Sequence, residues 1–317
     1  MRVPLEKAVD LLRGGEVVAI PTETVYGLAA WLFKESAIEK IFTLKNRPST
    51  NPLIIHVRDA DECAFYASAQ PADVYKLTEA FWPGPLTVVL PIHEKKVPLI
   101  ARAGLKTAAF RCPAHPVAAE LLKCVSPLVA PSANLSGTPS STKPEHVEHD
   151  FGPQFPALEG ECRHGLESTI IAQKNGLWEI ARLGAISPEE IARIIGYLPK
   201  CAHLVEKTPI CPGQLLVHYA PKARLILSNT PYEACEKKCP VVLGFTDRVY
   251  PGAKKWLFLG SLTAPHEVSF NLYDCLRRLD IEGIKEAWVD LDIPHNGIWA
   301  TIRERLFRAA GATLTLQ

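Results

Sequence analysis

The sequence predicts an α/β protein with two domains joined by a linker. Its 317 residues are enough for roughly two domains of ordinary size. Short apolar runs alternate with amphipathic segments of helix length, which is the pattern of sheets covered by helices. This periodicity lapses once, between the two halves. We therefore place a first domain at residues 1–196, a linker at 197–222 and a smaller second domain at 223–317.

The elements of the first domain follow from local start and stop signals. Gly14 and Gly15 close the first helix, and the buried strand after it runs into Pro21. Ser36 is a plausible N-cap for the second helix, which must stop before Arg47 because the next residue is a proline. The predicted helices are 4–13, 37–44, 71–81, 116–124 and 188–195, and the predicted strands are 17–20, 53–57, 86–90, 107–111, 128–130, 168–172 and 178–181.

A proline-rich segment and a second alternating region make up the rest of the chain. Pro199, Pro209, Pro212 and Gly213 accumulate where the periodicity lapses, so we expect an extended linker whose length suggests a functional role. The regular alternation beyond it predicts a small parallel sheet. The predicted strands there are 224–227, 241–245, 256–259 and 287–291, and the predicted helices are 232–238, 268–279 and 299–309.

The composition excludes several classes of protein. Lysine and arginine number 35 against 34 aspartate and glutamate, so no overall charge would gather polyanions or hold an anionic membrane. No apolar run approaches the about 18 residues of a membrane helix, and we recognise no signal peptide. Nine cysteines, an odd number in a long chain, favour reduced thiols and a cytoplasmic location. The two Cys-x-His pairs lack the usual spacing of zinc ligands, so structural zinc is disfavoured.

Three basic residues stand where they could bind an anion. Lys45 and Arg47 lie at a helix end that proline prevents from continuing, so their charged ends could meet at a triphosphate. They could also be solvated residues that complement the helix dipole. Arg111 ends an apolar strand, where burying a guanidinium is costly unless a carboxylate or phosphate meets it. A ligand and a structural salt bridge would both satisfy that requirement.

Short polar side chains lie in the loops at the strand ends, where α/β proteins keep their ligand groups. Thr24, Ser132, Asn134 and Ser168 could read a small polar substrate, or each could cap a turn. His56 alternates with apolar neighbours and could be an ordinary core histidine. Neither G-x-x-x-x-G-K-[ST] nor G-x-G-x-x-G occurs, so a nucleotide would need another cradle. A serine acyl-enzyme is disfavoured because its motif-like triplets occur in the wrong order.

Seven segments are notable for their order along the chain: PTETVYGLAA, KNRPSTNPLIIHV, FWPGPLTVVL, FRCPAHP, APSANLSGTPS, GLESTII and CPGQLLVHYAPKA. Taken together, and in this order, they resemble the threonylcarbamoyl-AMP synthase family in its long, two-domain form. The linker is similar to the proline-glycine to His-Tyr-Ala-Pro stretch of that form. It departs from the family at Leu215, Leu216 and Val217, where basic or aromatic residues are frequent, and at Cys211, which replaces a common serine.

The resemblance implies both a fold and a reaction. The first domain would be YrdC-like, with a twisted mixed sheet, helices and a large positively lined cavity. The second would be a Rossmann-like parallel α/β domain, and the linker would close over the cavity. The implied reaction converts L-threonine, bicarbonate and ATP, with Mg²⁺, to L-threonylcarbamoyladenylate and pyrophosphate. A downstream tRNA threonylcarbamoyl transferase machinery would use that product on tRNAs that read codons beginning with A.

Carried over by motif position, the resemblance assigns roles to individual residues. We expect catalysis to be electrostatic, with Lys45, Arg47 and Mg²⁺ stabilising the departing pyrophosphate while Arg111 grips the threonine carboxylate. No protein ligand is assigned to the metal. ATP binding is assigned to Lys45, Arg47, Asn51, Thr107, Asn134, Thr142, Arg182 and Tyr219, and threonine binding to Thr24, His56, Arg111, Ser132 and Ser168.

Two other functions fit the sequence. A pure RNA-binding module is suggested by the family's connection to tRNA, although the net charge of +1 argues against tight non-specific binding and leaves only weak tRNA contact. A carbamoyl-transfer domain that uses carbamoyl phosphate is the other, because a shared fold does not fix the substrate.

Overall fold

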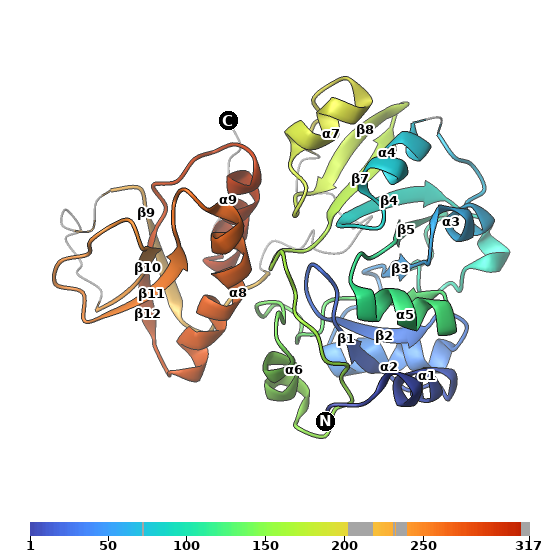
Figure 1. The fold of residues 1–317 in the computed structure, drawn as a ribbon, viewed down its shortest axis with the longest axis horizontal. Helices are drawn as coiled ribbons and strands as arrows, with labels where there is room; N and C mark the ends of the chain where they lie inside the picture. The colour runs from blue at the N-terminus through green and yellow to red at the C-terminus, as the bar shows by residue number, and fades with distance from the viewer. Residues whose placement is uncertain (72, 202–217, 231, 233–239, 312–317) are drawn as a thin grey trace.

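The computed structural model describes residues 1–71, 73–201, 218–230, 232 and 240–311. These residues form a larger and a smaller lobe (Figure 1). An eight-stranded sheet lies in the larger lobe and a four-stranded sheet in the smaller one. Helices pack against both sheets, so the predicted α/β class is confirmed. Most of the predicted linker, residues 202–217, lies outside the described part of the chain.

Both lobes are built from helices and strands. The larger lobe contains α1 (Leu5–Arg13), β1 (Val18–Ile20), β2 (Gly27–Trp31), α2 (Glu35–Lys45), β3 (Ile54–His56), α3 (Ala60–Tyr66), α4 (Val74–Phe81), β4 (Leu86–Pro91), the 3₁₀ helix η1 (Glu94–Lys96), β5 (Thr107–Arg111), α5 (Pro116–Cys124), β6 (Leu128–Val129), α6 (Pro144–Phe151), β7 (Thr169–Lys174), β8 (Leu177–Arg182) and α7 (Pro188–Ile195). The smaller lobe contains β9 (Arg224–Ser228), β10 (Val241–Phe245), β11 (Lys255–Gly260), α8 (Pro265–Ile281), β12 (Glu286–Asp290) and α9 (Ile298–Ala309).

The predicted elements in the described chain are present, with shifts of a few residues at their ends. β5 and α5 coincide with the prediction. Helix α7 starts with a capping box in which Ser187 Oγ accepts from the Glu190 amide and the Glu190 carboxylate accepts from the Ser187 amide. The N-cap prediction at Ser36 is wrong, because α2 already begins at Glu35 and Lys34 occupies the cap position. The helix predicted at 232–238 lies, apart from Tyr232, outside the described residues.

The sequence reading missed β2, α3 and α6. Strand β2 begins at Gly27, directly after the polar segment that contains Thr24, so the loop between β1 and the next element is shorter than expected. Helix α3 is a short helix capped by Asp59, whose side chain accepts from the Glu62 amide at 2.8 Å. Helix α6 begins with Pro144 at its first helical position. Both helices are too short for an apolar period to stand out.

The pairing of the larger sheet brings several strand ends together. Its strand order is β1-β2-β6-β3-β5-β4-β7-β8, with parallel and antiparallel neighbours. Parallel strands β3 and β5 pair in a register that sets His56 beside Arg111. An isolated bridge pairs Gly27, the first residue of β2, with Ser132, which follows β6. The polar segments beside these strand ends therefore converge on one region.

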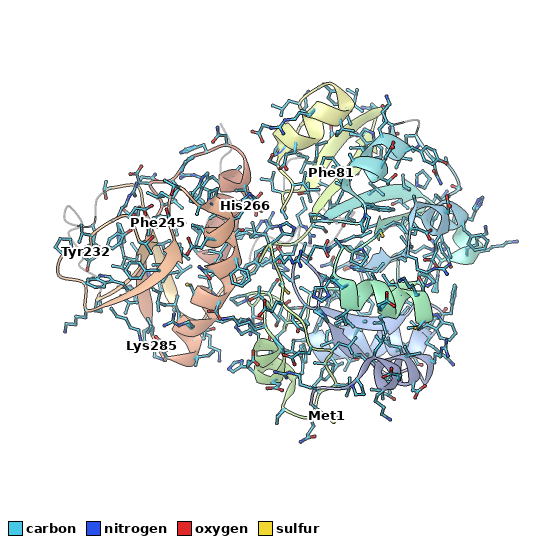
Figure 2. All side chains as sticks on the ribbon, in the orientation of Figure 1. Met1, Phe81, Tyr232, Phe245, His266 and Lys285 are labelled. Atoms are coloured by element: carbon cyan, nitrogen blue, oxygen red, sulfur yellow. The ribbon has the colours of Figure 1, made fainter. Side chains whose placement is uncertain are left out.

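The smaller sheet is fully parallel, as predicted, with the order β11-β10-β12-β9. Helices α8 and α9 lie between it and the larger lobe (Figure 1). Phe245 of β10 packs edge-on against Trp299 of α9, with ring centroids 6.0 Å apart. Tyr232 lies on the outer side of the sheet against Trp288 (Figure 2). Apolar residues therefore cover both faces of this sheet.

The two lobes share a buried apolar cluster. Val25 and Leu166 of the larger lobe pack in the same cluster as the inward side chains of α8 and α9. Tyr219, between the lobes, is 1% exposed and belongs to that cluster. Polar bonds accompany this contact, including one from Thr301 Oγ1 of α9 to the Gly184 carbonyl at 2.9 Å. The smaller lobe is therefore docked against the segments around residues 25, 166 and 184.

Replacement of Gly184 by alanine should destabilise the larger lobe. A Cβ at this position would lie 2.3 Å from Thr169 N and 2.5 Å from Glu167 O, both backbone atoms. The overpacking should lower the free energy of unfolding by about 1–3 kcal/mol, measured by urea denaturation. Gly14→Ala is the control, because the nearest atom to its Cβ would be Asp10 O at 3.2 Å. Equal effects of the two substitutions would contradict the prediction.

Candidate active site

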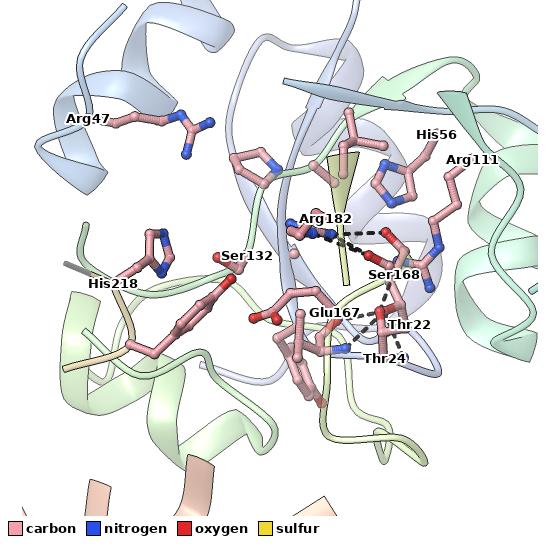
Figure 3. Close-up of a pocket in the computed structure, with 17 residues that line it drawn as sticks. Thr22, Thr24, Arg47, His56, Arg111, Ser132, Glu167, Ser168, Arg182 and His218 are labelled. Carbon is pink, nitrogen blue, oxygen red and sulfur yellow. Dashed lines mark hydrogen bonds between the residues drawn. The ribbon is translucent and has the colours of Figure 1, made fainter. Parts of the chain in front are cut away.

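A pocket that is partly open to solvent lies in the larger lobe and extends to residues 218 and 219 (Figure 3). Arg47 and His218 lie on one side of it, and His56 and Arg111 lie on the other. The segments at the ends of β2, β3, β5, β6 and β7 supply most of its wall. The lining residues are Thr22, Thr24, Val25, Tyr26, Gly27, Arg47, Ile54, His56, Arg111, Ala130, Pro131, Ser132, Glu167, Ser168, Arg182, His218 and Tyr219.

Arg111 is the centre of a buried polar cluster at one end of the pocket. Its Nη2 donates to Glu23 Oε1 at 2.7 Å, its Nη1 to Thr24 Oγ1 at 2.9 Å and its Nε to Gly84 O at 3.3 Å. Burial raises the pKa of Glu23, but the Arg111 charge and hydrogen bonds outweigh burial and hold that pKa below its usual value. Arg111 therefore makes a structural ion pair and also faces the pocket.

His56 lies beside Arg111 on the paired strand β3. It is 2% exposed, and its Nδ1 has no hydrogen-bond partner among the described residues. Burial, with the positive charge of Arg111 nearby, lowers the pKa of His56 to about 3. The ring is therefore neutral near pH 7 and offers an unpaired nitrogen to a ligand.

The buried state of His56 predicts a pH-dependent stability. Its pKa is about 3 when folded and about 6.5 when unfolded, so the unfolded chain binds the extra proton between these values. The contribution of His56 to the free energy of unfolding is fully present above about pH 6.5. It falls by about 1.4 kcal/mol per pH unit as the pH drops toward 3. Urea denaturation between pH 6 and pH 4 measures the free energy of unfolding at each pH. In His56→Gln this free energy should depend on pH less steeply than in the wild type, by about 1.4 kcal/mol per pH unit. An unchanged slope would contradict the assignment.

Ser168 is held from two sides at the start of β7. Its Oγ lies 2.7 Å from Thr87 Oγ1. Arg182 Nη2 donates to Ser168 O at 2.8 Å and to Ser168 Oγ at 3.1 Å (Figure 3). Arg182 ends β8, which pairs directly with β7, and Ser168 immediately precedes β7. The Ser168 hydroxyl is thereby fixed at the pocket wall.

The other side of the pocket carries unpaired polar atoms. His218 Nδ1 and Tyr219 Oη are buried and have no hydrogen-bond partner in the described chain. Their rings lie 4.0 Å apart between centroids. Arg47 Nη2 donates to Pro52 O at 2.9 Å, which fixes the guanidinium at the rim. A ligand on this side would meet a cation, an imidazole and a phenol.

Lys45 does not line the pocket. Its Nζ donates to the carbonyl oxygens of Ser132 and Asn134, so it holds the segment after β6 from behind. Burial, with Arg47 nearby, places the pKa of Lys45 well below its usual value. Asn46, at the C-cap, has a left-handed backbone with φ 51°, and the chain turns between Lys45 and Arg47. In this structure the Lys45 ammonium points to these carbonyl oxygens while Arg47 lines the pocket, and the role of Lys45 in binding ATP stays a prediction.

Four further predicted nucleotide residues lie outside the lining. Thr107 begins β5, at the opposite end of that strand from Arg111. The Thr142 amide donates to His146 Nδ1 at 3.2 Å. Asn51 and Asn134 are buried, and each has an Oδ1 atom without a partner among the described residues. Their roles in nucleotide binding stay predictions.

The sequence reading did not single out Thr22, Glu167 and His218, which also line the pocket. Each is within two residues of a predicted site residue, in the same family-like segment. Glu167 Oε1 accepts from Ser140 Oγ at 2.6 Å, and its Oε2 accepts from Tyr273 Oη of α8 at 2.9 Å. Their position within these segments could therefore have predicted them as pocket residues. The residue type alone could not have predicted Glu167, because a carboxylate is unexpected beside a polyphosphate.

The described residues offer no metal-binding cluster, no disulfide and no helix that could cross a membrane. In the described chain, no group of three or more His, Cys, Asp or Glu side chains is arranged to hold a metal ion. The six cysteines in that part are free thiols. None of the helices described is both long and apolar enough to cross a bilayer.

Comparison with known proteins identifies the family. A family model described as "Telomere recombination" matches residues 10–184, and a second, described as "Threonylcarbamoyl-AMP synthase, C-terminal domain", matches residues 186–311. The threonylcarbamoyl-AMP synthase of Pyrococcus abyssi is 35% identical over 96% of this chain and 93% of its own length. The chain belongs to the threonylcarbamoyl-AMP synthase family. The family's enzyme from Bacillus subtilis is also 35% identical, over 97% of this chain and 93% of its own.

A solved structure supports the same relationship. The crystal structure of P. abyssi Sua5 complexed with L-threonine superimposes with a TM-score of 0.89 at 33% identity. The match covers 98% of this chain and 96% of that one. Both lobes are therefore shared with this member of the threonylcarbamoyl-AMP synthase family. The family resemblance, the mixed sheet of the first lobe and the parallel sheet of the second are confirmed.

Proposed function

We propose that this chain synthesises L-threonylcarbamoyladenylate and pyrophosphate from L-threonine, bicarbonate and ATP in the pocket described above. Its membership of the threonylcarbamoyl-AMP synthase family supports the activity. The observation that carries the assignment to this pocket is its division into two ends. Buried hydrogen-bonding groups around Arg111 form one end, and Arg47, His218 and Tyr219 form the other. We therefore assign one substrate to each end.

We assign threonine to the end around Arg111. This guanidinium uses three of its five N–H donors on Glu23, Thr24 and Gly84, which leaves two for a carboxylate. The neutral His56 ring and the fixed Ser168 hydroxyl lie at the same end and can meet the substrate's polar groups. A small zwitterion with a hydroxyl fits this set of donors and acceptors better than a bulky apolar ligand.

We assign the nucleotide to the end around Arg47. The guanidinium supplies positive charge to phosphates, and the orphaned atoms of His218 and Tyr219 supply hydrogen-bonding sites. Mg²⁺ is part of the substrate as MgATP, where phosphate oxygens coordinate it. Asn51, Thr107, Asn134 and Thr142 would reach the nucleotide only if its base or ribose extended beyond the described lining.

The geometry favours positioning over covalent catalysis. A carbamate oxygen formed on the threonine nitrogen attacks the α-phosphate, and pyrophosphate departs from the opposite side. The bond from oxygen to phosphorus forms as the bond to the bridging oxygen breaks, so no nucleophile of the protein is needed. Arg47 offsets charge on the leaving group, while Arg111 fixes the threonine carboxylate. Tyr219 and His218 cover the site and keep the carbamate away from bulk water.

The product would serve tRNA modification in the cytoplasm. An acyl adenylate of this kind is a mixed anhydride that hydrolyses in water, so a transferase must take it up quickly. The downstream tRNA threonylcarbamoyl transferase machinery is therefore the proposed partner, with at most weak contact between this chain and tRNA.

Mass spectrometry of the products tests the proposal. The chain should form threonylcarbamoyladenylate with ATP, L-threonine and bicarbonate, and omission of any one should abolish the product. Product formed from carbamoyl phosphate in place of bicarbonate would favour the carbamoyl-transfer alternative. Salt-dependent retention of tRNA without consumption of ATP would favour the RNA-binding alternative. Either result would overturn the assignment.

A further inference from the structure

Arg305 of helix α9 connects the smaller lobe to the pocket without lining it. The side chain is fully buried, and its Nη2 donates to the Leu183 carbonyl of the larger lobe at 2.6 Å. Its Nε donates to Glu167 Oε2 and to Tyr273 Oη, both at 3.1 Å. Its guanidinium carbon lies 4.7 Å from the centre of the Tyr219 ring. One side chain of the second lobe therefore contacts two residues of the pocket wall.

Glu167 needs a cation in this place. Its carboxylate is 5% exposed and lies in the wall of a pocket that also presents Arg47. An unpaired carboxylate there would repel the phosphates of a nucleotide through a medium of low dielectric constant. Although burial raises the pKa of Glu167, the charges of Arg305 and Arg182 lower it to about 2, so the group is ionised. Arg305 Nη1 also pairs with Glu304, which pairs in turn with Arg308, so this arginine bridges two buried carboxylates and supplies Glu167 with positive charge at the pocket wall.

Tyr219 also depends on its neighbours. Its φ of 64° lies in the left-handed region, which is costly for a residue other than glycine and is kept only when surrounding contacts enforce it. Its ring stacks on Tyr273 at 5.4 Å between centroids, and Arg305 lies over the ring. Its buried hydroxyl has no partner in the described chain and lies at the pocket. These contacts hold the phenol where a ligand can complete its hydrogen bonding.

We propose that Arg305 is a positioning residue for the nucleotide end of the pocket. It fixes the Tyr219 ring and neutralises Glu167, so that the second lobe supports nucleotide binding without touching the nucleotide. This inference rests on the proposed function, because it takes the Arg47 end as the nucleotide site. Threonine binding should depend on it much less, since Arg111 and His56 make no described contact with Arg305.

The experiment compares two arginines of one helix. Arg305→Met removes the buried charge, whereas Arg303→Met is the control, because Arg303 is also buried but donates to Leu291 and Asn229 within its own lobe. We expect Arg305→Met to weaken binding of the non-hydrolysable analogue α,β-methylene-ATP about tenfold by calorimetry. L-Threonine binding should change less than about threefold, and Arg303→Met should leave both affinities within about twofold.

A second substitution separates positioning from a loosened lobe contact. Glu167→Gln in the Arg305→Met background removes the carboxylate at the pocket wall, while Arg308 still pairs with Glu304, and it should restore part of the lost nucleotide affinity. Arg305→Lys keeps the charge but not the planar group over Tyr219, and an intermediate loss is expected. If Arg305→Met does not fold, Arg305→Lys and the double variant replace it in the binding measurements. The inference would be overturned if Arg305→Met bound the analogue as tightly as Arg303→Met does. It would also be overturned if Arg305→Met lost affinity for the analogue and for L-threonine equally and Glu167→Gln restored neither.

The failure of this inference can be told apart from failure of the proposed function. Binding is measured without turnover, so a wild-type chain that binds the analogue but makes no adenylate would overturn the function and leave the comparison of variants valid. A wild-type chain that makes adenylate, with an Arg305→Met variant that binds the analogue normally, would overturn only the inference. A wild-type chain that binds no analogue would overturn both.

Discussion

Arg111→Ala should raise the KM for L-threonine by about ten- to a hundredfold. The charge-assisted bonds to a carboxylate that this substitution removes contribute about 1.5–3 kcal/mol. The same change leaves Glu23 buried and unpaired, so the free energy of unfolding should also fall by about 3–5 kcal/mol. Pyrophosphate release at varied threonine concentration measures the first effect, and urea denaturation measures the second.

A double variant separates the two effects of this substitution. Glu23→Gln together with Arg111→Ala removes the unpaired carboxylate, so much of the lost stability should return. The KM for threonine should stay high, because no guanidinium is restored. A wild-type threonine KM in a folded Arg111→Ala chain would show that this residue does not hold the substrate carboxylate.

Removal of every residue beyond Ala202 should lower adenylate formation by at least about a hundredfold. The truncated chain loses His218 and Tyr219 from the pocket wall, and Glu167 loses Arg305. Misplacement of groups around reacting atoms by about 1 Å can already cost that much. Mass spectrometry of the adenylate, at saturating ATP and threonine, measures the loss.

Threonine binding is the control for the truncation. The polar cluster around Arg111 lies wholly within the first 182 residues, so a folded truncated domain should still bind threonine by calorimetry. Circular dichroism should confirm its folding, because the cut exposes Val25 and Leu166. Full turnover by the truncated domain would refute a role for the linker and the second lobe in the reaction.

Local signals in the sequence were sufficient for most elements but not for the site's internal contacts. The capping box at Ser187 and the alternating second half predicted α7 and the parallel sheet, because both are encoded by neighbouring residues. The segments of the pocket were found because polar residues follow apolar strands. Thr24, His56 and Arg111 indeed meet at one end of it.

The contacts that escaped prediction join residues far apart in the chain. Glu23 and Arg111 pair across 88 positions, and Glu167 meets Arg305 across 138. No local pattern encodes either partner, so the sequence left a ligand and a salt bridge equally open at Arg111. The direction of the Lys45 side chain escaped prediction for a different reason. The left-handed Asn46 turns the chain, and a proline two residues later gives no sign of that direction.

That turn at Asn46 has a mechanical consequence. Because Lys45 at the end of helix α2 bonds to the backbone of Ser132 and Asn134, and Arg47 lines the pocket two residues further on, the end of this helix connects two parts of the pocket wall. Tilting this helix would shift the Ser132 backbone and Arg47 together, whereas unwinding its last turn would let them move independently. Lengthening or shortening this helix should therefore be tolerated far less than changes along its outer surface.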